Sequence, residues 1–125
     1  DIDPFEKYFI EEKNITYFDM NIIKQTNFYC ILNELSKFIE NKNIHISIDI
    51  DVLDSSIVPC TGTPVKNGLQ LNELFRILYF IHSISNIHHY DIVEFNPKIG
   101  NSDNLITTIN TIKQLLDIIW CIHIK

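Results

Sequence analysis

The sequence predicts an α/β fold built around a parallel sheet. Stretches in which apolar residues recur every three or four positions alternate along the chain with short stretches in which every second residue is apolar. The first pattern is typical of helices and the second of strands, and their alternation favours crossover connections between parallel strands. With 125 residues, 46% of them hydrophobic, the chain is long enough for one globular domain or for part of a larger one.

The first part of the chain is predicted to form a helix, a strand and a second helix. A proline, which has no backbone N–H to leave unpaired, begins a helix over residues 5–13. A short apolar stretch at 15–18 predicts a strand. The next helix, with Asp19 or Asn21 as its cap, runs to the polar turn at 41–43.

The second part carries the clearest alternation. Isoleucine at every second position of residues 44–50 predicts a strand whose polar side chains share the other face. Two prolines and two glycines make residues 52–68 an irregular loop, and loops of this length inside compact domains usually have a function. A helix over 69–83, a strand over 89–95 and a final helix capped by Asp103 complete the pattern.

Composition and charge exclude several classes of partner. Sixteen acidic residues against ten basic ones give a formal net charge of −6, so we expect neither nucleic acid nor an acidic membrane surface as a partner. We find no apolar run of the roughly 18 residues that a membrane span needs, and expect none. The three cysteines lack the spacing of a zinc site or a disulfide framework, which favours a reducing, cytoplasmic compartment. Because the sequence starts at Asp1 rather than at methionine, we expect part of a longer chain.

Asp49 and Asp51 form the sharpest candidate for a functional site. Residues i and i+2 of a strand project to the same face, with Cα atoms roughly 6.5 to 7 Å apart. Both stand where the strand over 44–50 ends, which is the end at which parallel sheets bind ligands. Neighbouring carboxylates repel unless a cation, hydrogen bonds or a shared proton compensates their charge, and oxygen ligands favour Mg²⁺, Ca²⁺ or Mn²⁺. The spacing alone leaves open a pair that merely caps the loop in contact with solvent.

The residues around this pair resemble the signature of the arginase family, within the ureohydrolase superfamily. The family's SxDxD and TGTP elements are similar to Ser47-Ile48-Asp49-Ile50-Asp51 and to Thr61-Gly62-Thr63-Pro64. A second family segment resembles Asp91-Ile92-Val93-Glu94-Phe95-Asn96-Pro97, in which Glu94 stands 94 − 51 = 43 residues beyond Asp51, as the family has it. A third resembles residues 1–8, with Asp3, Pro4, Glu6 and Tyr8. The resemblance covers nearly the whole chain, but only the C-terminal portion of a family member.

The resemblance implies a fold and an assembly. The fold is a three-layer α/β/α architecture with a parallel sheet, incomplete in this chain, and residues 1–125 would form the C-terminal part of a single ureohydrolase catalytic domain. The implied assembly is a homo-oligomer, a trimer in that family. Three departures from the family pattern are Ser55, in place of proline, Cys60, in place of glycine or alanine, and Asn67, in place of glycine. Asparagine is a mild substitute at a turn that needs a positive φ.

The resemblance also implies a reaction, the hydrolysis of L-arginine to L-ornithine and urea by a hydroxide that bridges two manganese ions. Carried over position by position, Asp49 bridges the two Mn²⁺ ions and Asp51 binds one of them. The implied substrate-binding residues are Asp3 and Glu6 at the α-amino group, Thr63 in the pocket and Glu94 at the guanidinium. Carboxylates suit these contacts because they accept two parallel N–H bonds from a planar cation.

The residues that complete this site belong to a part of the family sequence that precedes Asp1, and no catalytic residue is assigned within this chain. Two carboxylates cannot complete the shells of two metal ions, and none of the five histidines has a ligand spacing that fills the gap. We therefore expect the isolated chain to be inactive. The chain could equally be a catalytically incomplete fragment, or a structural homologue without activity.

Two enzyme classes compete with arginase. An agmatinase-type ureohydrolase shares the aspartate motif, but agmatinases tend to carry serine or another small residue where Asn96 stands. A phosphatase with Asp49 as nucleophile and Asp51 as general acid is the second class. It is disfavoured because Leu53 stands where that family has threonine or valine, and because no later lysine with a paired acidic motif is found.

Overall fold

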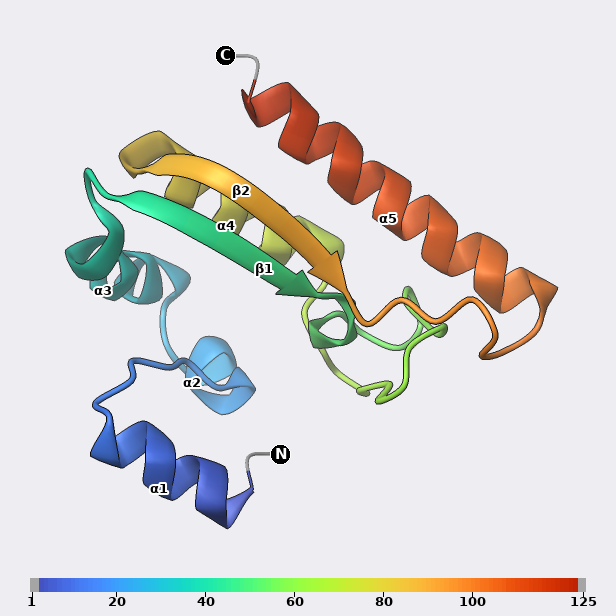
Figure 1. Cartoon of the computed structure of the whole chain (residues 1–125), viewed down its shortest axis with the longest axis horizontal. Coiled ribbons are helices and arrows are strands. Elements are labelled where there is room, and N and C mark those ends of the chain that lie inside the picture. Colours follow the sequence, from blue (N-terminus) through green and yellow to red (C-terminus); the bar gives the residue numbers. More distant parts are fainter. Residues whose placement is uncertain (1–2, 124–125) are drawn as a thin grey trace. The chain divides into compact units, whose positions relative to one another are not determined.

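The computed structural model describes residues 3–123 (Figure 1). These residues form two compact units, one that ends at Ile31 and one that begins at Leu32. The helices are α1 (Pro4–Glu12), α2 (Met20–Gln25), α3 (Phe28–Ile39), α4 (Leu71–Ile84) and α5 (Ser102–His123), the strands are β1 (Asn43–Asp49) and β2 (Asn86–Val93), and a 3₁₀ helix, η1 (Ile50–Val52), follows β1. Helix α3 crosses the boundary between the units.

Side-chain caps begin both helices of the first unit. Asp3 Oδ1 accepts the N–H of Phe5 at 2.6 Å, and Glu6 Oε2 accepts the N–H of Asp3 at 3.0 Å, which makes a reciprocal capping box for α1. Asp19 Oδ1 accepts the N–H of Ile22 at 2.7 Å at the start of α2. Of the two predicted caps of this second helix, Asp19 is therefore confirmed.

Two predictions for the same region are wrong. Residues 15–18 form no strand, because no strand within residues 3–123 pairs with them. The helix predicted from Asp19 to the polar turn is broken at Thr26, whose backbone is extended with ψ 147°. Asn27 then starts α3, since its Oδ1 accepts the N–H of Tyr29 at 2.9 Å. Local polar contacts therefore divide one apolar pattern into two helices.

Strands β1 and β2 are parallel, as predicted, and they are the two strands of the sheet in the part of the chain that the structure describes. Asp49 pairs with Val93 at the carboxyl end of the sheet, and one irregularity lies between Ile44 and His45. Ile48, in the middle of the alternating pattern, is buried. Strand β2 begins three residues earlier than predicted, at Asn86.

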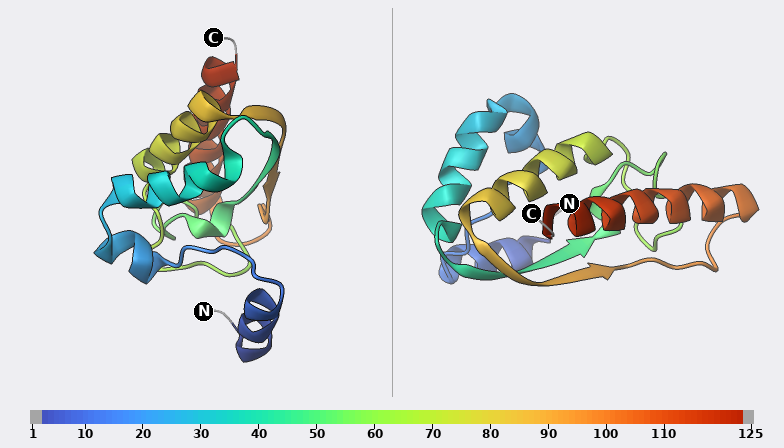
Figure 2. Two further views of the ribbon diagram at one scale, coloured as in Figure 1. Left: turned by 90° about the vertical axis from the view of Figure 1, so that its left-hand side faces the viewer. Right: turned by 90° about the horizontal axis from the view of Figure 1, so that it is seen from above.

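Helices α4 and α5 pack against each other on one face of this sheet (Figures 1 and 2). The buried apolar side chains of the second unit are Leu32, Ile48, Ile50, Leu53, Val58, Cys60, Leu69, Leu74, Leu78, Ile87, Leu115 and Ile122. The other face of the sheet carries exposed polar side chains, with His45 Nε2 at 2.7 Å from Asp91 Oδ2. Parallel strands with helices packed on one face form an incomplete α/β fold, as predicted.

The two long helices begin close to their predicted positions. Helix α4 has Gln70 as N-cap, whose N–H donates to Glu73 Oε2 at 2.7 Å. Helix α5 is capped by Asn101 rather than by Asp103, because Asn101 Oδ1 accepts the N–H of Asn104 at 2.9 Å. The predicted Asp103 cap is therefore wrong by two residues, and Asp103 lies in the first turn of the helix.

Helix α5 is long and apolar enough, over Ser102–Ile122, to cross a membrane by length and composition. The expectation that no stretch of the chain has this character is therefore wrong for α5. One such helix is weak evidence of a span, because core helices of water-soluble proteins have the same length and composition. In α5, Thr108, Thr111 and Leu115 are buried, and Thr111 Oγ1 donates to the carbonyl of Ile57 at 2.7 Å.

The two ends of the loop between η1 and α4 are joined by backbone hydrogen bonds. The N–H of Leu69 donates to the carbonyl of Val52 at 2.9 Å, and the N–H of Asp54 donates to the carbonyl of Leu69 at 3.0 Å. Between them, Gly68 lies so close to the opposite backbone that an added Cβ would stand 2.7 Å from Asp54 N and Leu53 C. The loop can close here because glycine has no Cβ.

We expect Gly68→Ala to lower the free energy of unfolding by about 1–3 kcal/mol, because the added methyl group forces the two backbone segments apart. Gly62→Ala is the matched control in the same loop, where nothing lies within 4 Å of the added Cβ. That variant should change the free energy by about 0.5 kcal/mol or less. Urea unfolding followed by circular dichroism measures both variants, and equal losses would contradict the close backbone approach at Gly68.

Candidate functional site

Three acidic residues of the second unit meet at the carboxyl end of the sheet. Asp49 is the last residue of β1, Asp51 lies in η1, and Glu94 directly follows Val93, the partner of Asp49 in the sheet register. The negative charges of Asp51 and Glu94 both act on the Asp49 carboxyl group, so the three side chains lie within electrostatic range. The structure therefore brings together three of the residues that the sequence selected.

The Asp49 carboxyl group has a pKa above its ordinary value. The largest cause is burial, which removes water from the charged form, and the charges of Asp51 and Glu94 act in the same direction. The N–H of Asp51 opposes them by donating to Asp49 Oδ1 at 3.2 Å. An acidic group of this kind favours the binding of a proton or a cation.

The loop brings Thr63 and Thr61 to the same place. Thr63 Oγ1 donates to Asp51 Oδ2. Thr61, which is buried, pairs with Phe95 in an antiparallel bridge, one residue beyond Glu94. The TGT segment therefore contacts both acidic segments of the site. The place of Thr63 in a substrate pocket stays a prediction.

Cys60 connects this loop to two other parts of the second unit. Its N–H donates to Thr108 Oγ1 of α5 at 3.1 Å, and its thiol donates to the carbonyl of Ile99 at 2.9 Å. Its carbonyl accepts the N–H of Asn96 at 3.0 Å, next to the Glu94 segment. Thr108 is a residue of the site region that the sequence alone did not indicate. The signal that could have found it is a pair of threonines three residues apart, Thr108 and Thr111, in a helix otherwise rich in isoleucine and leucine.

Glu94 has an unusual backbone conformation. Its φ is +67°, in the left-handed region that residues other than glycine rarely occupy. Such conformations cost about 1–3 kcal/mol and persist where the surrounding structure holds them. Here the neighbouring Phe95 is held by its bridge to Thr61, and the Glu94 side chain remains exposed at the end of the strand.

Asp54, three residues after Asp51, holds the loop together. Its Oδ1 accepts the N–H of Ser56 at 2.9 Å and the hydroxyl of Ser56 at 2.5 Å, and its Oδ2 accepts the N–H of Asn67 at 2.7 Å. These donors, the Ser56 hydroxyl first among them, hold the pKa of Asp54 below its ordinary value. Asn67 has a φ of +60°, which confirms that this turn needs the positive φ that asparagine tolerates.

Asp3 and Glu6, predicted to face the α-amino group of a substrate, lie in the first unit. Both carboxylates accept backbone N–H groups in the capping box of α1. These contacts give each acid a structural task, and their contact with a substrate stays a prediction. Asp1 and Ile2, which belong to the same motif, lie outside the described residues.

The acidic pair supplies part of a metal site. Among residues 3–122, no group of three or more His, Cys, Asp or Glu side chains is placed to hold a metal ion. Asp49, at the end of β1, and Asp51, in η1, nevertheless have carboxylate oxygens. Such oxygens are suitable ligands for manganese. The donor chemistry fits, and the number of donors is incomplete. Of the histidines, His45 pairs with Asp91 on the exposed face of the sheet. The side chain of His123 is not among the side chains that the structure describes.

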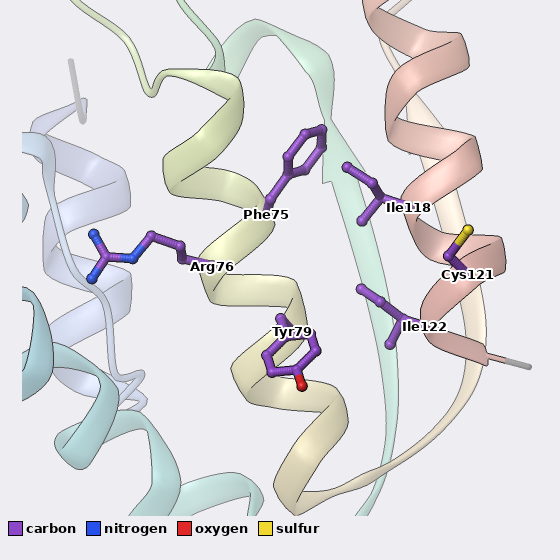
Figure 3. A pocket seen from close by; sticks show the side chains of 6 residues that line it. All are labelled: Phe75, Arg76, Tyr79, Ile118, Cys121 and Ile122. Atoms are coloured by element: carbon purple, nitrogen blue, oxygen red, sulfur yellow. The ribbon is translucent and has the colours of Figure 1, made fainter. Parts of the chain in front are cut away.

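An apolar pocket of about 410 Å³ lies between α4 and α5 (Figure 3). The residues that line it are Phe75, Arg76, Tyr79, Ile118, Cys121 and Ile122. None of the predicted site residues is among them, and the lining has little of the acidic character expected for a cationic substrate. The pocket is therefore separate from the acidic site.

Comparisons with known proteins give a consistent result. Residues 1–122 match a family model described as Arginase family. The arginase of Plasmodium berghei (strain Anka) is 40% identical over 109 residues, which are 85% of this chain and 31% of that protein. The chain spans about a third of the length of the curated relatives it matches.

Solved structures agree with this result. The structure of Entamoeba histolytica arginase in complex with L-ornithine has a TM-score of 0.74 and 30% identity, and the match covers 92% of this chain and 40% of that one. Formimidoylglutamase from Bacillus subtilis subsp. subtilis str. 168 has a TM-score of 0.71 at 22% identity, over 89% of this chain and 36% of that one. At that identity the match shows a common fold alone.

We expect the stabilising effect of the Asp54 carboxylate to depend on pH. Its folded-state pKa lies below the ordinary value of 3.8. The contribution is therefore fully present above that value and is lost as the pH falls through the folded-state pKa. The difference in free energy of unfolding between the parent and Asp54→Asn should shrink as the pH is lowered from about 6 to about 3.

Denaturant unfolding at a series of pH values measures this difference. Ser56→Ala serves as the comparison variant, because it keeps the carboxylate and removes the largest cause of the lowered pKa. It should show a weaker dependence on pH than the parent. A difference between parent and Asp54→Asn that stays constant with pH would argue against this role of the carboxylate.

Proposed function

The chain belongs to the arginase family, and on this premise we propose that it is the C-terminal part of a single ureohydrolase catalytic domain that hydrolyses L-arginine to L-ornithine and urea. The observation that carries the proposal is the meeting of Asp49, Asp51 and Glu94 at the carboxyl end of two parallel strands. Open α/β sheets bind their ligands at this end. Three acids in one place suit a cationic substrate and metal ions.

Glu94 binds the guanidinium group of the substrate. Its carboxylate is exposed at the end of β2, and a carboxylate recognises a planar guanidinium by accepting two parallel N–H bonds. The left-handed backbone of Glu94 sets the direction in which the chain leaves the strand, beside the TGT segment. By the family resemblance, Asp3 and Glu6 contact the α-amino group of the substrate, and Thr63 lies in the substrate pocket.

Asp49 and Asp51 are the residues of this chain that would hold the manganese ions, as the family implies. Their negative charges, together with that of Glu94, repel one another unless a cation compensates them. When bound, the ions supply a nucleophile from water at neutral pH for attack on the guanidinium carbon. The remaining ligands and the group that moves the proton come from a segment outside these 125 residues.

The choice of arginine over agmatine depends on how the protein recognises the α-carboxylate and α-amino groups of arginine. Asn96 stands where agmatinases tend to have a small residue, and its N–H donates to the carbonyl of Cys60 at 3.0 Å, close to Glu94. Asp3 and Glu6 also favour a substrate with an α-amino group. An agmatinase-type enzyme remains the second candidate, and a homologue without activity is the third.

The wider setting is proposed on the same basis. We propose a homotrimer, as the family implies, in the cytoplasm. The net charge of −6 favours neither nucleic acid nor an acidic membrane surface as a partner.

We expect Asp49→Ala, in the complete polypeptide that carries these residues, to abolish the loading of two manganese ions, because the ligand shared by both ions is lost. Metal analysis after gel filtration measures the bound manganese per chain. Asp91→Ala is the matched control, since Asp91 is an exposed acid of the same sheet that binds His45 instead. Retention of both ions by Asp49→Ala would show that the bridging assignment is wrong.

We expect purified residues 1–125 to release no urea from arginine with Mn²⁺ present, whereas the complete polypeptide should hydrolyse arginine faster than agmatine. A colorimetric urea assay with both substrates measures this. Clear turnover by residues 1–125 alone would refute the inference that ligands are supplied from outside. Faster hydrolysis of agmatine would favour the second candidate. The residues preceding Asp1 should contain a histidine ligand and an Asp-x-His-x-Asp segment.

A further inference from the structure

Thr63 makes a contact that a place in the substrate pocket does not explain. Its hydroxyl donates to Oδ2 of Asp51, and Asp51 lies in the 3₁₀ turn just beyond the end of β1. We propose that Thr63 is a positioning residue that holds the Asp51 carboxylate in the orientation required to bind a manganese ion. The inference deepens the proposed function and rests on it.

Asp51 lies in a short segment of backbone directly after the strand. Strand β1 ends at Asp49, and η1 is a single turn of three residues. The N–H of Asp51 is used on Asp49 Oδ1 at 3.2 Å, which positions Asp49. The carboxyl groups of Asp51 and Asp49 lie within hydrogen-bonding reach of each other, and their like charges repel when both are ionised. The hydroxyl that donates to Oδ2 compensates part of the Asp51 charge and holds the group in this orientation.

Thr63 is itself held on both sides. Two residues before it, Thr61 is buried and paired with Phe95. Two residues after it, the carbonyl of Val65 accepts the N–H of Ser55 at 2.8 Å. The proline at position 64 restricts the backbone of Thr63 further, and a β-branched side chain has few χ1 rotamers. The hydroxyl is therefore presented to Asp51 by a constrained segment, as positioning requires.

The contact also limits what Thr63 can do for a substrate. A threonine hydroxyl has one hydrogen and two lone pairs. The hydrogen is donated to Asp51, so only acceptor capacity remains for other groups. Thr63 can accept an N–H from a guanidinium, but its only hydrogen is already donated to Asp51.

Thr63→Val in the complete polypeptide tests the proposal, because valine keeps the branched shape and removes the hydroxyl. The Mn²⁺ dissociation constant, measured by isothermal titration calorimetry of the metal-free protein, should rise by about 10- to 100-fold, the usual effect of losing a group that orients a metal ligand. Thr63→Ser, which restores the hydroxyl, should return the constant to within about threefold of the parent. Thermal unfolding of the metal-free variants provides the control for folding.

The outcomes separate this inference from the proposed function. Parental Mn²⁺ affinity in Thr63→Val, with only the KM for arginine raised, would overturn the positioning role and leave the function standing. Equal weakening in Thr63→Val and Thr63→Ser would also overturn it, because the hydroxyl would then not be the cause. Parental Mn²⁺ affinity in Asp51→Asn would overturn the assignment of Asp51 as a ligand, and with it the proposed function and this inference.

Discussion

The parallel pairing of β1 and β2 is the constraint on which the acidic site depends. In a parallel pair both carboxyl ends lie at one edge, so Asp49 and Glu94, far apart in sequence, come within electrostatic range. The same register buries Ile48, which is 4% exposed. Because side chains alternate between faces, a shift of one residue would exchange Ile48 and Asp49 between the core and the site. Burial of the isoleucines in the core therefore keeps the acids at the edge.

Asp49 and Asp54, five residues apart, perform different tasks because their surroundings differ. Asp54 has two donors from Ser56 and one from Asn67, and its pKa is lowered. Asp49 is partly buried, near two like charges, and its pKa is raised. The donors around Asp54 stabilise its ionised carboxylate in the folded loop. The surroundings of Asp49 instead disfavour its ionised form. An acid whose charge the protein itself compensates serves the fold, and one whose charge it does not compensate is available to a ligand.

The sequence predicted those features that depend on neighbouring residues. Alternating isoleucine predicted β1, and asparagine at position 67 indicated a positive φ. The strand expected at 15–18 failed because a strand requires a partner, which local pattern does not supply. The contact of Thr108 with Cys60 joins residues 48 apart, so the pair of threonines in α5 could indicate Thr108 but not its partner. The family motif located the acidic site, but contacts that run through the loop, such as that of Thr63 with Asp51, required the structure.

The site places unfavourable features together, and the rest of the second unit maintains them. Glu94 holds a left-handed backbone, and its charge adds to the repulsion at Asp49. The contacts that hold the backbone in place against this strain and repulsion lie just outside the site. They are the Thr61–Phe95 bridge, the Cys60 hydrogen bonds to Thr108 and Ile99, and the close backbone approach at Gly68. Each of these contacts is buried or made by backbone, and none of them uses a carboxylate of the site. A cation that binds the folded acids and not the unfolded chain then adds stability in proportion to its affinity. In the proposed function, metal binding and the stability of this edge of the sheet are therefore coupled through Asp49 and Asp51.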